Sequence, residues 1–151
     1  MCFFRRKKAL NKVYLTLLNI SGIDNVKRVD SRAFDFEMKY NNKTFLIKMI
    51  HHPSKCEINV NSPSYWQINH GVVSSRKSGE KMKGVYDLLN FKLADNGYGK
   101  NTVKLYVIYP YSKHMMKVIN ECEMVFIKPN TDIYGCRINN YNDLKDNIDK
   151  F

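Results

Sequence analysis

The sequence has no Cys-x-x-Cys pair, no glycine-rich phosphate loop and no apolar run approaching the roughly 20 residues of a membrane span. Its four cysteines, Cys2, Cys56, Cys122 and Cys136, are widely separated, which is not the pattern of a zinc cluster or a small disulfide framework. The N-terminal segment places its positive charges after an apolar pair and lacks a long apolar region, unlike a secretory signal. We therefore expect a cytoplasmic chain with reduced thiols and no transmembrane segment.

Acidic residues are also scarce, since 14 aspartates and glutamates stand against 25 lysines and arginines, which leaves a net charge of +11. An excess of this size favours polyanions such as DNA or RNA, or an anionic membrane surface, and a solvated lysine-rich surface is the alternative explanation. We expect two basic groups to form one contiguous nucleic-acid-binding surface. The first group lies at the start of the first predicted helix, and the second lies in and after a Ser/Gly-containing loop. Together they comprise Arg5, Arg6, Lys7, Lys8, Lys12, Arg76, Lys77, Lys81 and Lys83.

The chain has 151 residues, 44% of them hydrophobic, which is enough for one domain (residues 1–151) with a buried core. Apolar residues recur at helical spacing over residues 10–18, and Ser21-Gly22 supplies a stop. Strand-like runs follow at residues 26–29, 34–40, 44–50, 57–60 and 65–68. Asn41-Asn42 separates the second run from the third and predicts a tight hairpin turn, because asparagine tolerates positive φ angles.

The second half of the chain predicts helices and strands in alternation. An amphipathic helix is expected over residues 82–93, and an apolar strand over 103–109 that lies inside the sheet. The remaining expected elements are a helix at 113–120, strands at 124–127 and 136–138, and a terminal helix from Asn142, with Asn140 or Asn142 as N-cap. This order predicts an α/β fold with one mixed sheet flanked by helices.

One stretch carries a resemblance to a known family. It runs Ala33-Phe-Asp-Phe-Glu-Met-Lys-Tyr-Asn-Asn-Lys-Thr-Phe-Leu-Ile-Lys-Met-Ile50 and resembles the strand-turn-strand motif of the nuclease-related domain (NERD) branch of the PD-(D/E)XK, restriction-endonuclease-like superfamily. Trp66 with Asn69-His-Gly71, the run 103–109 and Tyr141-Asn-Asp-Leu144 extend the likeness over most of the chain. The resemblance implies an α-β-β-β-α-β core and a nuclease that holds Mg²⁺ or Mn²⁺ between an aspartate and a glutamate.

The active-site motif of that family is broken in this chain. Asp35 takes the aspartate position, whereas Lys48 takes the glutamate position and Ile50 the lysine position. An ammonium repels a cation that needs oxygen ligands, and isoleucine supplies no proton chemistry, so we expect no metal and no cofactor. The two-residue turn places Asp35 opposite Lys48, where the two could form a salt bridge, and a shift of one residue would place Glu37 there instead.

A second interpretation keeps the enzyme active. Glu37-Met38-Lys39 is itself an E-x-K triplet, with Asp35, Asp24 or Asp30 as its aspartate partner. In that case Asp35, Glu37 and Lys39 are catalytic and Mg²⁺ or Mn²⁺ is the cofactor. The same strand alternates apolar with charged residues, which is also typical of an ordinary half-exposed strand.

Three functions therefore remain open. The first is a non-catalytic or weakly active nuclease-like domain that binds DNA or RNA through its basic surface. The second is a protein-interaction domain whose positive charge is incidental, and the third is the active metal-dependent nuclease. Trp66 could stack on a base or belong to the core.

Overall fold

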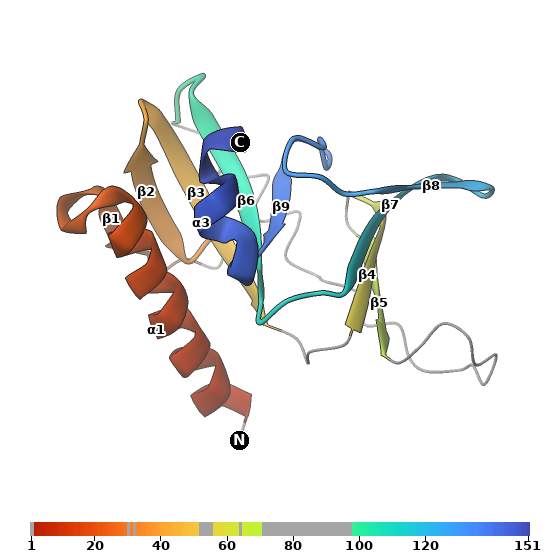
Figure 1. Ribbon diagram of the computed structural model, residues 1–151, viewed down its shortest axis with the longest axis horizontal. Helices are drawn as coiled ribbons and strands as arrows, with labels where there is room; N and C mark the ends of the chain where they lie inside the picture. The colour runs from red at the N-terminus through yellow and green to blue at the C-terminus, as the bar shows by residue number, and fades with distance from the viewer. Residues whose placement is uncertain (1, 30, 32, 52–55, 64, 71–97) are drawn as a thin grey trace.

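The computed structural model describes residues 2–29, 31, 33–51, 56–63, 65–70 and 98–151 (Figure 1). Two mixed β-sheets stand side by side, and helical segments cover one face of the larger sheet. The expected mixed α/β class is confirmed. The expectation of one sheet is wrong, because the strands predicted at 57–60 and 65–68 pair with each other, and the first of them also pairs with residues 114–117, in a sheet of their own.

Helix α1 (Cys2–Ser21) begins the chain and confirms the first predicted helix. It contains neither glycine nor proline, and its buried residues Ala9, Val13 and Leu17 recur every four positions, which gives one continuous apolar stripe. Gly22 ends it with a φ of 88°, and its N–H donates to the Leu18 carbonyl at 2.8 Å. A short 3₁₀ turn, η1 (Ile23–Asn25), then leads into the sheet.

Within the described residues, the larger sheet has five strands in the order β1-β2-β3-β6-β9. Its strands are β1 (Val26–Arg28), β2 (Phe36–Tyr40), β3 (Lys43–His51), β6 (Thr102–Tyr109) and β9 (Arg137–Asn140). The first three pair antiparallel, whereas β6 runs parallel to both β3 and β9. The expected interior position of the 103–109 strand is confirmed.

The turn between β2 and β3 is the predicted two-residue hairpin. Asn41 and Asn42 have φ angles of 47° and 59°, as this tight turn requires. Tyr40 pairs with Lys43, and the register continues to Phe36 opposite Ile47, which confirms the predicted main-chain alignment.

The part of the chain that the structure describes contributes four strands to the smaller sheet, in the order β5-β4-β7-β8. They are β4 (Cys56–Ser62), β5 (Tyr65–His70), β7 (His114–Asn120) and β8 (Glu123–Phe126). The prediction of a helix at 113–120 is wrong, because this segment is β7. Helical and extended periodicity are hard to distinguish in so short an apolar run. Here β4 on one side and β8 on the other supply the backbone hydrogen bonds that a helix would form internally.

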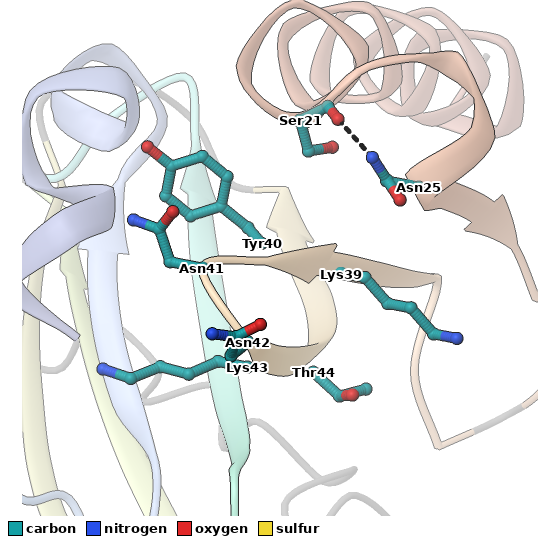
Figure 2. Close-up of a pocket in the computed structure, with 8 residues that line it drawn as sticks. All are labelled: Ser21, Asn25, Lys39, Tyr40, Asn41, Asn42, Lys43 and Thr44. Carbon is teal, nitrogen blue, oxygen red and sulfur yellow. Dashed lines mark hydrogen bonds between the residues drawn. The ribbon is translucent and has the colours of Figure 1, made fainter.

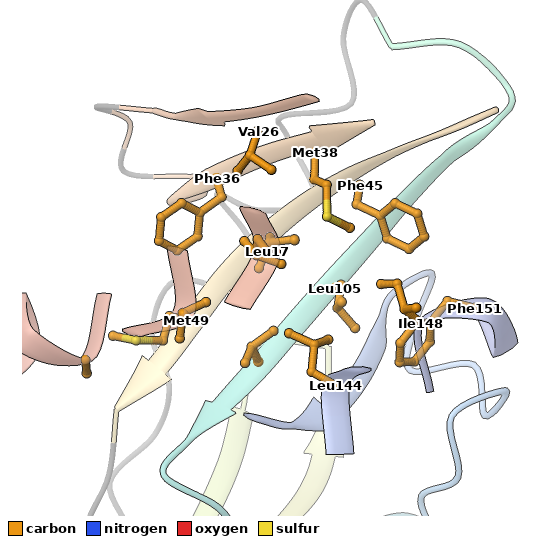
Figure 3. Packing of buried hydrophobic residues seen from close by; sticks show 14 residues of the cluster. Leu17, Val26, Phe36, Met38, Phe45, Met49, Leu105, Leu144, Ile148 and Phe151 are labelled. Atoms are coloured by element: carbon orange, nitrogen blue, oxygen red, sulfur yellow. The ribbon is translucent and has the colours of Figure 1, made fainter. Parts of the chain in front are cut away.

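Two layers of buried side chains lie on the two faces of the larger sheet. The helix-side core joins α1 and the C-terminal segment to the strands (Figure 3). Its members are Ala9, Val13, Leu17, Val26, Phe36, Met38, Phe45, Ile47, Met49, Leu105, Val107, Leu144, Ile148 and Phe151. The inter-sheet core joins the larger sheet to β4 and β5. Its members are Phe34, Leu46, Ile50, Ile58, Val60, Trp66, Tyr106, Ile108, Ile133, Cys136 and Ile138.

The chain ends in a helical segment, as the sequence predicts. It consists of η2 (Tyr141–Asp143), α3 (Leu144–Asn147) and η3 (Ile148–Lys150). Asn140 occupies the N-cap position of η2, but its side chain makes no capping hydrogen bond. It exchanges two hydrogen bonds with the Ser112 backbone instead, at 2.8 and 3.0 Å, and so ties β9 to the segment before β7.

Replacing Leu17 by alanine tests the contribution of the helix-side core. Leu17 is fully buried, so we expect Leu17→Ala to lower the free energy of unfolding by about 2–5 kcal/mol through lost contacts and a residual cavity. Leu15 lies on the same helix but is 59% exposed, and Leu15→Ala should change stability by only about 0.5 kcal/mol or less. Urea denaturation of both variants measures this, and equal losses would contradict the assigned orientation of α1.

Candidate functional site

The N-terminal half of α1 concentrates positive charge. It carries Arg5, Arg6, Lys7, Lys8 and Lys12, all exposed except the half-buried Arg6, and the whole helix contains no acidic residue. The N-terminus of a helix is also the positive end of its dipole, so cations there are unfavourable to the helix and favourable to a bound anion. The first basic group predicted from the sequence therefore forms one positive region.

Three of these cations lie along one flank of α1. Arg5, Lys8 and Lys12 are three and four residues apart, which places them in a row on a helix surface. Thr16 continues the row by one turn, and its hydroxyl lies 3.0 Å from the Tyr141 hydroxyl at the start of η2. We call Arg5, Lys8 and Lys12 the basic flank, and it runs on the side of α1 that meets Tyr141.

A row of aromatic rings lies at the carboxyl ends of β3 and β6. His51 ends β3, Tyr109 ends β6, and parallel pairing places them opposite each other. The His51 and Tyr109 ring centroids are 5.9 Å apart with an interplanar angle of 27°, and those of Tyr109 and Tyr141 are 5.0 Å apart at 58°. All three side chains are half-buried, so each keeps part of its surface accessible. We call these three residues the aromatic row.

The aromatic row and the start of α1 are close enough to interact electrostatically. Partial burial, and then the positive charges of Arg6 and Arg5, lower the pKa of His51 below its ordinary value. The neutral imidazole is therefore favoured in this position. The basic flank and the aromatic row thus belong to one region of the molecule, although they are distant in sequence.

Asp35 anchors the start of α1 to the sheet. One carboxylate oxygen lies 3.2 Å from the Arg6 guanidinium, and the other accepts a hydrogen bond from the Met49 N–H at 2.8 Å. The chain bends here, because Phe34 packs in the inter-sheet core and Phe36 in the helix-side core. The ion pair of Asp35 is therefore with Arg6, whereas the sequence predicted Lys48 as its partner.

The other positions of the broken motif are buried on the opposite face of the sheet. Lys48 and Ile50 alternate with residues of the helix-side core along β3, and each is only 8% exposed. Glu37 points to the same face as Lys48, and its carboxylate accepts a hydrogen bond from the Tyr98 hydroxyl at 3.3 Å. Burial, followed by the charge and hydrogen bond of Glu37, raises the pKa of Tyr98.

The residues of the alternative catalytic set do not share one side of the sheet, because Asp35 contacts Arg6 of α1 whereas Glu37 and Lys39 point to the other face of β2. Asp35 is engaged by Arg6 and Met49, Glu37 contacts Tyr98, and Lys39 is exposed farther along β2. Among the described residues, no group of three or more His, Cys, Asp and Glu side chains is arranged to hold a metal ion.

A polar pocket of about 420 Å³ lies at the other end of α1 (Figure 2). It is lined by Ser21, Asn25, Lys39, Tyr40, Asn41, Asn42, Lys43 and Thr44. Lys43 donates to the carbonyl of Phe151, and Asn25 donates to the Ser21 carbonyl at 2.6 Å. Because the carbonyl end of α1 faces this pocket, its helix dipole disfavours anions there. The N-terminal end of α1 is the better candidate site for a polyanion.

Of the remaining sequence predictions, the structure decides the one on Trp66, whereas two others concern residues outside the described part of the chain. Trp66 is fully buried, and its ring centroid lies 4.9 Å from that of Tyr106, so it belongs to the core rather than to a stacking surface. The second basic group lies outside the described residues, so the expected single positive surface remains a prediction; this group is Arg76, Lys77, Lys81 and Lys83. The second predicted helix, over residues 82–93, also lies outside them.

Sequence reasoning missed the aromatic row and one further basic contact. Tyr109-Pro110-Tyr111 marks the end of an apolar strand, but only parallel pairing with β3 brings His51 beside it. The Arg28 guanidinium lies 4.2 Å over the Tyr14 ring, on the opposite side of α1. Neither contact follows from spacing along the chain.

Comparisons with protein-family models, curated protein sequences and solved structures give no match to this chain. Among the described residues, no helix has the length and apolar character needed to cross a bilayer.

Substitutions at Asp35 separate its two roles. Asp35→Ala leaves the Met49 N–H without its acceptor, and we expect it to lower the free energy of unfolding by about 1–3 kcal/mol. Asp35→Asn keeps an oxygen acceptor and removes only the charge, so its loss should be smaller and close to that of Arg6→Gln. Denaturant titrations compare the three variants. An equal loss for Asp35→Ala and Asp35→Asn would show that the hydrogen bond to Met49 stabilises the fold less than the charge of Asp35 does.

The lowered pKa of His51 makes stability depend on pH in a defined direction. The unfolded chain binds a proton at His51 more readily than the folded chain, so stability falls as the pH drops from about 7 to about 5. His51→Gln removes this contribution, and we expect a flatter dependence of unfolding free energy on pH over that window. Denaturation at several pH values measures the difference, and parallel curves for the two proteins would refute it.

Proposed function

We propose that this chain is a restriction-endonuclease-like domain that binds nucleic acid and does not cleave it. The observation that carries the proposal is the position of the basic flank beside the aromatic row, at the carboxyl ends of β3 and β6. The order of α1, antiparallel β1, β2 and β3, and then β6 supports the fold assignment. It agrees with an α-β-β-β-α-β core whose second helix is expected within residues 82–93.

The basic flank supplies the electrostatic part of binding. The exposed Arg5, Lys8 and Lys12 would each neutralise a phosphate, and the release of condensed counterions would drive association. Their spacing along one helix side allows them to follow a backbone without reading bases. The dipole of α1 adds to this attraction because its positive end lies at the same place.

The aromatic row supplies a surface for an unpaired base. Half-buried rings of His51, Tyr109 and Tyr141 are held by one another, and so they lose little freedom when a base stacks on them. Stacking of this kind contributes about 1–3 kcal/mol per base and tolerates any sequence. We therefore favour single-stranded DNA or RNA over a duplex as the ligand.

The residues at the three positions of the nuclease motif, Asp35, Lys48 and Ile50, support the absence of cleavage. Asp35 already has a cation beside it, since Arg6 lies 3.2 Å from its carboxylate. Lys48 replaces the glutamate that would share a metal, and Ile50 replaces the lysine that would assist the attacking water. Mg²⁺ prefers several oxygen ligands, which this pair of substitutions does not supply.

Binding measurements at several salt concentrations test the proposal. We expect the native chain to bind a fluorescent 12-nucleotide single strand with an affinity that falls steeply as salt rises. Replacing Arg5, Lys8 and Lys12 together by glutamine should lower affinity about tenfold or more at 0.15 M salt and reduce the log–log slope by about 2. The matched control replaces Lys39, Lys100 and Lys150, which are exposed and lie outside α1, and should bind almost normally.

Other outcomes would redirect the assignment. An equal loss in both triple variants would indicate nonspecific attraction to net charge rather than a site on α1. Cleavage of single- or double-stranded nucleic acid with Mg²⁺ or Mn²⁺, abolished by Glu37→Ala, would overturn the non-cleaving assignment and favour the active nuclease. An affinity independent of salt would oppose the proposal as a whole.

A further inference from the structure

The hairpin of β7 and β8 exposes an unusual amount of apolar surface. Ile119, Met124, Val125 and Phe126 are 50%, 55%, 37% and 61% exposed, and every residue of β8 is exposed. In Figure 1, β8 projects outward at the edge of the smaller sheet, on the side away from the larger sheet. Proteins usually cover, shorten or charge such an edge strand, because it can pair with another chain.

Among the described residues, β8 is the edge of the smaller sheet, and its backbone has one side open for pairing. The Ile127 N–H donates to the Met115 carbonyl at 2.9 Å, which shows that residue 127 directs its backbone groups toward β7. Backbone groups alternate in direction along a strand, so those of Val125 also point to β7, and those of Met124 and Phe126 point to the open edge. The open edge therefore presents the backbone N–H and C=O groups of two residues, Met124 and Phe126.

We propose that a second copy of this chain pairs with the open edge, β8 against β8, antiparallel and around a two-fold axis at Val125. In this register Met124 of one copy lies opposite Phe126 of the other, and the same pair recurs across the axis. The outward backbone groups of Met124 and Phe126 then form hydrogen bonds, and the two four-stranded sheets become one sheet of eight strands.

Side-chain chemistry along the hairpin is complementary to itself in this arrangement. Met124 and Phe126 point to one face, so a thioether meets an aromatic ring at two symmetric positions. Glu121 and Glu123 lie at the tip of the hairpin, and Lys128 lies just beyond its other end; all three are exposed. Antiparallel pairing brings the acidic tip of each copy beside Lys128 of the other.

The charge of the chain favours this edge over other surfaces for self-association. Each copy carries a net charge of +11, so contacts between the basic regions of two copies would be repulsive. The residues along the proposed contact are instead two acids, Glu121 and Glu123, one lysine, Lys128, and the exposed apolar residues of β8. A contact built on backbone hydrogen bonds and apolar burial should also persist at high salt.

Analytical ultracentrifugation over a range of protein concentrations, at 0.15 and 0.5 M salt, tests the proposal. We expect the mass of two 17.8 kDa chains at both salt concentrations. Val125→Lys places two ammonium groups together at the axis and should raise the dissociation constant about tenfold or more. Ile23→Lys is the matched control, because Ile23 is 74% exposed and lies on η1, and this variant should dimerise normally.

Disulfide trapping tests the register independently of affinity. Val125 would face its own symmetry mate as a non-hydrogen-bonded pair, with Cα atoms about 4.5 Å apart, which is within the range that a disulfide spans. In a Cys122→Ser background, Val125→Cys should form a covalent dimer under mild oxidation, whereas Ile23→Cys in that background should not.

Three results would overturn the proposal. These are a monomer at all concentrations, a dimer that survives Val125→Lys unchanged, or covalent dimers formed equally by both cysteine variants. A monomer that binds an unrelated extended peptide along β8 would likewise reject the second copy as occupant. The circular dichroism spectrum of Val125→Lys should match that of the native chain, which shows that a loss of dimer does not result from unfolding.

Discussion

The parallel pairing of β3 with β6 is the interaction on which the rest of the structure depends. It runs from Thr44 opposite Thr102 to His51 opposite Tyr109, and both strands are buried along most of their length. Apolar side chains of both strands point alternately to the two faces of the sheet. The β3–β6 pair therefore contributes to the helix-side core on one face and to the inter-sheet core on the other. Removal of this pairing would leave α1 and the smaller sheet without a common surface.

The same pairing explains where the candidate site lies. The carboxyl ends of parallel strands meet at one edge, so His51 and Tyr109 become neighbours there. Asp35 then ties Arg6 to the end of β3, which brings the positive start of α1 to that edge. Asp35 therefore acts as a structural residue that orients a basic helix.

The two proposed surfaces are carried by different sheets. The basic flank lies on the helix that covers the larger sheet, whereas β8 is the outer strand of the smaller one. A dimer formed through β8 would therefore leave both copies of the basic flank accessible. Two such flanks on one particle would bind a long polyanion more tightly than either alone, provided that their separation allows both to contact it.

Local features of the sequence determined α1, the Asn41-Asn42 hairpin with its register, and the buried strand β6. Each depends on residues near one another in the chain, such as the apolar stripe ended by Gly22 or the two asparagines with positive φ. Only the tertiary structure decided that residues 113–120 form β7, that Asp35 pairs with Arg6 rather than Lys48, and that His51, Tyr109 and Tyr141 form a row. These outcomes depend on which distant strand or helix becomes a neighbour, and a short apolar run or a single carboxylate accepts several neighbours equally well until the rest of the chain has folded.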